Sequence, residues 1–349
     1  MAEKKIVVMG GSFNPPTIAH YKLMRAAVDE LKAEKGVFVP VSRAYLKRKM
    51  RKDGERICLS ERLRTDMLRS MCEQNDGLTV SEMDLGVAQV TFYQTLRKAE
   101  EEFPDANIYL LAGIDKLGLI RKWAEASDLL ARYGVVLFSR HDAEAKTAVM
   151  QDPVLKRFYG SFVFAAEPEG TKEISSSEVR KRMMSKESSE DLLHPKVWEK
   201  LKELSVEDFP VEIERFQGEY DFLGNDYTAP FVWDGLTYQC AEAAFQASKC
   251  EGDAERLRFV GCGAEKAKRY GKQCVPRSGW EADRLRLMED ILWAKFSQNP
   301  ELAARLKATG NAVLVAGNQG KDAFWGMDLY SCRGENHLGE ILMKIRAKE

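Results

Sequence analysis

The sequence predicts an α/β fold with a parallel sheet in its first half and an α+β, mostly helical fold in its second half. In the first half, short apolar runs typical of buried strands alternate with segments whose apolar residues recur at helical spacing. The clearest runs cover residues 6–9, 37–41, 108–112, 133–140 and 162–165. In the second half, a hairpin pattern about Asp234-Gly235 is followed by helical patterns without regular alternation, which argues against a second sheet of the same kind.

The chain length and a change of pattern near residue 205 predict two domains. At 349 residues the chain exceeds one typical domain. Between Leu204 and Glu212 the sequence becomes acidic and is interrupted by Pro210, as is typical of a connector. We therefore predict domains at residues 1–205 and 212–349.

The composition excludes several classes of protein. The formal net charge of -1 gives no general attraction to nucleic acid or acidic membranes. No apolar run approaches the roughly 20 residues that span a bilayer, and the early start of the first strand leaves no room for a signal peptide. The 7 cysteines are scattered and do not cluster with the 4 histidines. We therefore expect neither a disulfide framework nor a metal held by the protein, and a cytoplasmic location.

The stretch from Gly10 to His20 is the strongest candidate for a binding turn. It joins the apolar run 6–9 to a helical pattern, and Gly10 and Gly11 let a ligand approach the backbone closely. A helix N-terminus offers free N–H groups and a partial positive charge, which suit phosphate, and His20 in the first turn can hydrogen-bond phosphate oxygens. The spacing matches neither GxxxxGK[ST] nor GxGxxG. The alternative is a tight turn that binds nothing.

A basic run follows the second predicted strand and consists of Lys47, Arg48, Lys49, Arg51 and Lys52. The charge pattern alone favours a solvated mobile loop. The functional alternative is a flexible clamp on a triphosphate. Nucleic-acid binding is disfavoured because the run lacks interleaved aromatic residues.

Gly113 and Asp115 follow the apolar run 108–112, at the carboxyl end of a predicted parallel strand. Open α/β sheets bind their ligands at this edge. Trp123 follows eight residues after Asp115, and its alternative role is that of a core residue.

The string from Ile174 to Arg180 predicts a second anion site. Ser175 or Ser176 would cap the following helix, and Arg180 would lie one turn into it. An ordinary capped helix is the alternative interpretation.

In the second half, Glu242, Phe245, Gln246 and Lys249 are spaced so that they share one face of the helix opened by Cys240. A solvated polar stripe is the plain interpretation of this spacing. Phe245 in the middle of the stripe argues against full exposure.

The string from Gly10 to His20 resembles the GxFxPxxxxH signature of nucleotidyltransferases, most closely that of the nicotinamide/nicotinate mononucleotide adenylyltransferases. Thr17 stands where many members have the first histidine of HxGH, and His20 keeps the second. The run Ala44-Tyr45-Leu46-Lys47 is similar to the family's AYKKK, and residues 174–180 are similar to its ISST/SxxR motif. The resemblance covers about residues 1–205 and implies a Rossmann-like parallel sheet.

This first resemblance implies an adenylyl transfer from ATP, with Mg²⁺ accompanying the nucleotide. Catalysis would fall to His20, Lys47 and Arg180. Nucleotide binding would fall to Gly10, Gly11, Ser12, Phe13, Thr17, Gly113, Asp115, Trp123, Ser175 and Ser176. In the family, the region of Asp115 and Trp123 holds the nicotinoyl nucleotide, and the ISST/SxxR motif grips the ATP phosphates.

Residues 212–349 resemble the NADAR family, whose motif runs approximately FLSNFY…DG..Y.SVEHAFQA.K…FWG.G…G.N.LG..LM.VR. The matching strings are residues 222–227, 241–249, 324–328 and 334–346. The departures are Gly224, Asp226, Ala243 and Asp328, which leave the choice of substrate open. The resemblance implies catalysis by Glu242 and Lys249, and binding by Asn225, Gln246, Trp325, Asp328 and Asn336.

Together the two resemblances imply a bifunctional enzyme of NAD metabolism. The second half would hydrolyse an N-glycosidic bond, with Glu242 as acid/base and Lys249 able to form an imine with an opened sugar. Riboflavin intermediates, ADP-ribosylated guanine in nucleic acid and NAD-related nucleotides are the candidate substrates, and a homo-oligomer is left open. The rival interpretations are a non-catalytic NAD or ADP-ribose binding module in the second half, and another phosphate acceptor for the first half.

Overall fold

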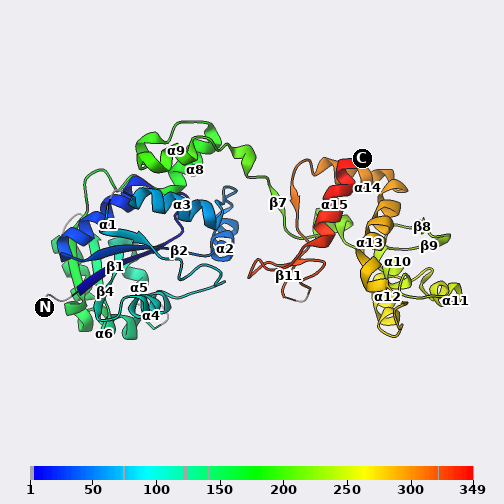
Figure 1. Ribbon diagram of the computed structural model, residues 1–349, viewed down its shortest axis with the longest axis horizontal. Helices are drawn as coiled ribbons and strands as arrows, with labels where there is room; N and C mark the ends of the chain where they lie inside the picture. Colours follow the sequence, from blue (N-terminus) through cyan, green and yellow to red (C-terminus); the bar gives the residue numbers. More distant parts are fainter. Residues whose placement is uncertain (1–3, 74, 121–124, 140–141, 321, 349) are drawn as a thin grey trace. The chain divides into compact units, whose positions relative to one another are not determined.

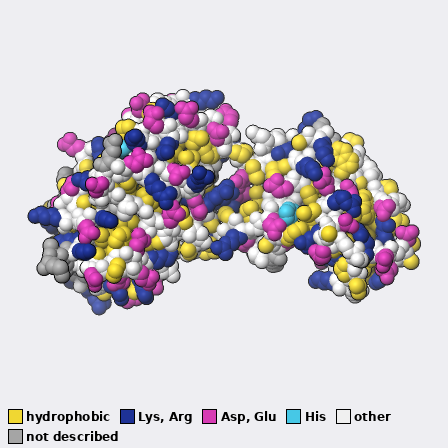
Figure 2. Space-filling model, in the orientation of Figure 1, with side chains coloured by type: hydrophobic (Ala, Val, Ile, Leu, Met, Phe, Trp, Pro, Cys, Tyr) yellow, Lys and Arg dark blue, Asp and Glu magenta, His cyan; other side chains and the backbone are white. Residues whose placement is uncertain are grey.

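The computed structural model describes residues 4–348 except 74, 121–124, 140–141 and 321. The chain forms two compact units, Met1–Phe209 and Pro210–Glu349, which are described separately (Figure 1). In the part of the chain that is described, no helix is long and apolar enough to cross a membrane. Basic and acidic side chains are interspersed on the face shown in Figure 2, as the near-zero net charge implies.

The first unit is built on a six-stranded parallel sheet in the order β3-β2-β1-β4-β5-β6. The strands are β1 (Lys4–Gly11), β2 (Lys35–Pro40), β3 (Leu78–Val80), β4 (Ala106–Gly113), β5 (Gly134–Ser139) and β6 (Phe162–Ala166). The chain runs outward from β1 through β2 to β3, then returns to β4 beside β1 and runs the other way. The strand order therefore reverses between β1 and β4, where open α/β sheets form their ligand crevice. The prediction of a parallel α/β sheet is confirmed.

Helices cover both faces of this sheet (Figure 1). The helices of this unit are α1 (Ile18–Leu31), α2 (Arg43–Asp53), α3 (Glu61–Cys72), α4 (Phe92–Glu102), α5 (Leu117–Ile120), α6 (Ala126–Arg132), α7 (Asp142–Gln151), α8 (Ser176–Ser185) and α9 (Pro195–Leu201). The two-residue period of β1 sends Val7 and Met9 into one core with α1, α3 and α9. It sends Ile6 and Val8 into a second core with α4, α6 and α7.

The basic run predicted as a loop is helical, because residues 47–52 lie within α2. Ser42 caps this helix by accepting a hydrogen bond from the Tyr45 N–H, at 3.2 Å, and Gly54 ends it in the left-handed conformation. Leu46 and Met50 are buried on one side, which leaves the basic residues on the outer side. Both interpretations of the basic run, a mobile loop and a flexible clamp, assumed an irregular segment, whereas these residues form a helix.

The second unit is mostly helical with three two-stranded sheets, as the sequence predicts. Its helices are α10 (Ala241–Ala247), α11 (Asp253–Arg256), α12 (Ala264–Gly271), α13 (Trp280–Ser297), α14 (Pro300–Ala308) and α15 (His337–Lys348). The strands are β7 (Glu212–Ile213), β8 (Phe231–Trp233), β9 (Leu236–Tyr238), β10 (Val313–Leu314), β11 (Gly317–Asn318) and β12 (Met327–Asp328). Asp234 and Gly235 both have positive φ, which confirms the hairpin between β8 and β9. One hydrophobic core joins α10, α13 and α15.

We expect residues 1–209 and 210–349 to fold independently when they are expressed apart, because each unit has hydrophobic cores of its own. Calorimetry of both fragments and of the whole chain checks this. Each fragment should unfold cooperatively near the temperature of the corresponding transition in the whole chain. Insoluble fragments, or a single transition shared by the whole chain, would contradict the expectation.

Candidate active sites

The turn after β1 is held in place by two buried polar side chains that sequence reasoning did not single out. Asn14 donates to the Ile57 carbonyl and accepts from the Leu59 N–H, each at 2.8 Å. Arg64 on α3, whose side chain is fully buried, donates to the carbonyls of Ser12 and Val41 at 2.8 and 2.7 Å. The side chains of Asn14 and Arg64 thus hold the backbone of the turn in place. The sequence carried no local signal for Arg64, because it lies in an ordinary helical pattern 52 residues from Ser12.

Gly10 and Gly11, two of the predicted nucleotide-binding residues of this turn, have aromatic neighbours close to the place of a side chain. A Cβ atom at Gly11 would lie 2.9 Å from the ring of Phe13, which is itself buried with a positive φ. A Cβ atom at Gly10 would lie 3.3 Å from the ring of Phe92. The backbone here is therefore the surface that a ligand would meet.

His20 is the third residue of α1, as predicted, and its ring is fixed by the N-cap residue Thr17. The Thr17 N–H donates to His20 Nδ1 at 2.9 Å, and the Thr17 hydroxyl lies 2.7 Å from the same nitrogen. Nδ1 therefore acts as an acceptor, which places the proton on Nε2. Burial lowers the pKa of His20 from 6.5 to about 4. At neutral pH the side chain offers an N–H donor and no positive charge.

The serine-arginine motif of α8 meets the same turn, although more than 150 residues separate the two in sequence. Ser175 is the N-cap and accepts from the Glu178 N–H at 3.1 Å. Ser176 donates to the Pro15 carbonyl at 2.8 Å. Arg180, with a side chain only 7% exposed, donates to the Asn14 carbonyl at 2.6 Å. The structure therefore brings the two predicted anion sites together into one.

Arg180 is also paired with a carboxylate. Its Nε contacts Glu55, in the segment after α2, and its Nη2 donates to Ser177 at 2.9 Å. A phosphate that is to reach this guanidinium must replace the Glu55 carboxylate.

The remaining predicted residues of the first half have varied positions. Lys47 lies within α2 and is partly exposed. Gly113 ends β4, and Asp115 follows in a short 3₁₀ turn, Ile114–Lys116, at the carboxyl edge of the sheet. The side chain of Asp115 and the whole of Trp123 lie outside the described residues.

The second unit contains a cavity of about 440 Å³ that gathers four of its predicted residues: Asn225, Glu242, Gln246 and Trp325. The other lining residues are Phe216, Gln217, Phe245, Lys268, Met288, Ala316, Gly317, Asn318, Asp322, Gly326 and Leu338. The cavity wall thus combines a carboxylate, amides and an aromatic face from segments spread over a hundred residues. This is the composition of a site for a polar ligand with a flat ring.

Glu242 is nearly buried, and hydrogen bonds hold both its backbone and its side chain. Its N–H donates to the Asn225 carbonyl at 2.8 Å, and its carboxylate accepts from Gln246 Nε2 at 2.8 Å. The Gln246 oxygen faces Gly271 on α12, where a Cβ atom would lie 1.8 Å away. The amide oxygens of Asn225 and Gln246 are buried without a hydrogen-bond partner among the described residues. Buried acceptors of this kind are costly to leave unpaired.

An aromatic column supports the cavity. Trp325 meets Phe245 edge to face, with ring centroids 5.2 Å apart, and Phe245 contacts Trp280 at 5.3 Å. Trp325 therefore packs against Phe245 and also lines the cavity.

The structure corrects the placement of Lys249. Helix α10 ends at Ala247, and Ser248 at its end accepts a hydrogen bond from the Trp280 indole at 3.0 Å. Lys249 therefore lies past the helix, with its Nζ 5.1 Å from the centre of the Trp280 ring, and is not among the residues that line the cavity. The lysine that does line it is Lys268 on α12. No feature of the sequence distinguishes Lys268 from its basic neighbours Lys266 and Arg269.

Asp328 and Asn336 also lie outside the cavity lining and hold backbone instead. The Asp328 carboxylate accepts from the hydroxyl of Ser331 at 2.6 Å, and hydrogen bonds from Ser331 lower its pKa. Asn336 accepts from the Ala316 N–H and donates to the Leu314 carbonyl, both at 2.9 Å. Asn336 thus orders the segment that carries the cavity residues 316–318.

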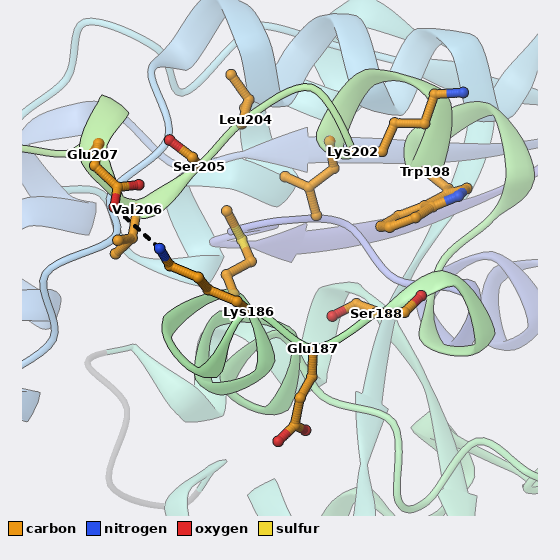
Figure 3. Close-up of a pocket in the computed structure, with 12 residues that line it drawn as sticks. Lys186, Glu187, Ser188, Trp198, Lys202, Leu204, Ser205, Val206 and Glu207 are labelled. Carbon is orange, nitrogen blue, oxygen red and sulfur yellow. Dashed lines mark ion pairs between the residues drawn. The ribbon is translucent and has the colours of Figure 1, made fainter.

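A further pocket, of about 320 Å³, lies at the end of α8 and contains none of the predicted site residues (Figure 3). Trp198 on α9 and Lys202 form one side of it, and the ion pair between Lys186 and Glu207, at 3.7 Å, closes another. Its cations and carboxylates balance, so it offers no preference for an anion.

The two halves of the chain match two different protein families. Residues 8–182, half of the chain, match the family described as cytidylyltransferase-like, and residues 212–348 match the NADAR domain. The chain therefore belongs to the cytidylyltransferase-like family through its first half and to the NADAR family through its second half. It is an enzyme with an adenylyltransferase-like domain and an N-glycosidase-like domain.

Individual relatives match one half each. A probable nicotinate-nucleotide adenylyltransferase of Clostridium tetani is 26% identical over 206 residues, which are 58% of this chain and 98% of that protein. One of Maridesulfovibrio salexigens is 32% identical over 160 residues, 46% of this chain and 70% of that protein. The N-glycosidase YbiA of Escherichia coli is 36% identical over 131 residues, 37% of this chain and 81% of that protein.

We expect His20 to titrate near pH 4 in the free protein, as followed by the NMR signals of its ring. The unfolded chain would protonate near 6.5 and so would bind more protons than the folded state between about pH 4 and 6.5. This site should therefore lower the stability of the first unit as the pH falls through that window. A ring that titrates at 6.5 or above would contradict this environment.

Proposed function

We propose that the first half transfers AMP from ATP to nicotinamide or nicotinate mononucleotide, giving the dinucleotide and pyrophosphate. The observation that supports this most is the meeting of the α1 turn and the α8 motif, through Ser176 on Pro15 and Arg180 on Asn14. It creates one surface of backbone N–H groups, a histidine N–H donor and a buried guanidinium, all suited to phosphate.

In the proposed reaction, a phosphate oxygen of the mononucleotide attacks the α-phosphorus of ATP. The bond from that phosphorus to the bridging oxygen breaks, and pyrophosphate leaves with the electron pair. His20 Nε2–H would donate to a phosphate oxygen as charge develops, and Arg180 would exchange Glu55 for phosphate. Positioning and charge stabilisation are enough for such a step. Among the described residues, no group of three or more His, Cys, Asp or Glu could hold a metal, so Mg²⁺ would arrive on the triphosphate.

The rival for this half is transfer to another phosphate acceptor, such as the phosphates of pantetheine or choline. Incubation with ATP and each acceptor in turn, with pyrophosphate release as the signal, separates the two. Pyrophosphate release with a nicotinoyl mononucleotide, and not with the other acceptors, supports the proposal.

His20→Ala should lower the rate of adenylyl transfer by roughly 10²–10³-fold, the range for loss of one donor to a developing negative charge. The measurement is pyrophosphate release at saturating substrates. His194→Ala is the matched control, because His194 is also a helix-end histidine with a pKa lowered by burial but caps α9. A His20→Ala rate within tenfold of wild type would remove this role.

For the second half we propose hydrolysis of an N-glycosidic bond in an ADP-ribose-type or riboflavin-intermediate substrate. The supporting observation is Glu242, a nearly buried carboxylate oriented by Gln246 beside unpaired amide oxygens and the ring of Trp325. Ribose hydroxyls would donate to the Glu242 carboxylate, and Trp325 would stack on a base.

In the proposed hydrolysis, the bond between the anomeric carbon and the base nitrogen breaks, and its electrons go to the base. Glu242 would move the proton that this departure or the incoming water requires. If the C1–ring-oxygen bond breaks first, C1 is left as an iminium to the base nitrogen; a lysine amine that has lost its proton can add to C1 and expel the base, and one water then hydrolyses the lysine imine to the sugar aldehyde and returns the amine. Lys249 is the candidate from sequence, and Lys268 is the candidate from its place in the cavity lining.

Glu242→Gln should slow turnover by roughly 10²–10⁴-fold while it keeps the shape of the site. The assay is base release from a panel of NAD, nicotinamide mononucleotide, a ribosylaminouracil riboflavin intermediate and an oligonucleotide with ADP-ribosylated guanine. Borohydride should trap the sugar on Lys249 or Lys268, and Lys→Arg at the trapped position should abolish trapping. Lys266→Arg, on α12 but outside the cavity lining, is the control. Binding of the panel without any turnover would favour the non-catalytic module.

A further inference from the structure

The second unit contains an ammonium group that is completely buried. Lys295 on α13 is 0% exposed, and no other lysine among the described residues is buried in this way. Its Nζ donates to the carbonyls of Phe222 and Gly224, at 2.8 and 2.9 Å. It makes no salt bridge with a described carboxylate. The rings of Tyr227 and Phe296 lie 5.6 and 5.2 Å from it.

The Asp226 and Asp221 carboxylates act on Lys295 only at longer range. A buried cation without a salt bridge is expensive to maintain, so its presence calls for an explanation. Burial lowers the pKa of Lys295 to about 8. This environment is the one that imine formation would favour. Yet the amine is not among the groups that line the cavity, and both of its hydrogen bonds go to backbone.

The two carbonyls belong to the segment that precedes the cavity residue Asn225. One residue further on, the Asn225 carbonyl accepts the N–H of Glu242, and the Asn225 side chain lines the cavity with an unpaired oxygen. Helix α10 has no side-chain cap at Cys240, so this backbone contact satisfies one of its free N–H groups. The segment is closely packed at Gly224, because a Cβ atom there would lie 2.6 Å from the Asp226 side chain and 3.1 Å from the Asp221 carbonyl.

We propose that Lys295 is a positioning residue for the N-glycosidase site: its ammonium fixes residues 222–225, and through them the Asn225 amide and the Glu242 carboxylate. The inference rests on the function proposed for this half. Two carbonyls directed at one point repel each other and need a shared donor. Without Lys295 they would be buried and unpaired, and the segment would move to reach water.

The test is Lys295→Met in the full chain, followed by hydrogen exchange of the backbone amides. We expect the Glu242 N–H to exchange at least about tenfold faster, while amides of α15 keep their wild-type protection. In the base-release assay, with the panel compound that wild type cleaves fastest, we expect kcat to fall more than KM rises. If Lys295→Met does not fold, Lys295→Gln, which keeps one N–H donor group, replaces it.

Arg346→Met is the matched control. Arg346 also donates to a backbone carbonyl from a partly buried position, with its Nη1 2.8 Å from the Ala312 carbonyl, but it does not line the cavity. It should lower stability without changing Glu242 exchange or kcat. If Arg346→Met lowers kcat equally, Lys295 is only structural and the inference fails.

Two further results would overturn the inference. Unchanged Glu242 exchange in an active Lys295→Met protein would show that Lys295 does not hold the segment, while the proposed function stands. Borohydride trapping on Lys295 itself would make it a catalytic amine instead. If wild type cleaves no compound of the panel, the proposed hydrolysis fails, and the inference fails with it whatever the exchange data show.

Discussion

The first site depends on donors for three carbonyl groups of one turn, those of Ser12, Asn14 and Pro15. A peptide directs its N–H and C=O to opposite sides, so a turn that offers N–H groups to a phosphate sends carbonyls into the protein. Arg64 satisfies the first, Arg180 the second and Ser176 the third. The donors come from α3 and α8, so the turn, the sheet edge and the second motif are one hydrogen-bonded unit.

In the second half, other polar side chains likewise satisfy the carbonyl groups of irregular backbone. Lys295 satisfies two carbonyls of the segment 222–225, and Asn336 binds both an N–H and a carbonyl around residue 315. In both halves, long polar side chains from distant helices replace regular secondary structure where the backbone must stay irregular. The irregular segments contribute the turn backbone and Asn225, whereas His20 and Glu242 lie on helices.

Among the described residues, neither site gathers an excess of charged side chains of one sign; the charged groups are paired with an opposite charge or an amide, or kept neutral by burial. Burial keeps the His20 ring neutral at physiological pH, and Glu55 accompanies Arg180. In the reaction proposed for this half, a polyphosphate would gain the charge of Arg180 only as it displaces Glu55. In the NADAR cavity, the Glu242 carboxylate is paired with the Gln246 amide.

The fold classes of both halves and the position of the first turn could be predicted from the sequence alone. The apolar runs predicted the parallel sheet, and the place of His20 in the first turn of α1 followed from local helix rules. Local patterns suffice for these features because they depend on neighbours within one strand or one helical turn.

Only the tertiary structure decided which distant groups meet. Spacing put Lys249 on the face of Glu242, but α10 ends at Ala247, and Lys268 of another helix lines the cavity instead. Likewise, the basic run became helical because Leu46 and Met50 are buried against the domain. No local pattern in the sequence assigned a role to Arg64 or to Lys295. Their roles arise from carbonyls 52 and more than 70 residues away, and only the folded chain creates the unpaired acceptors that such buried cations satisfy.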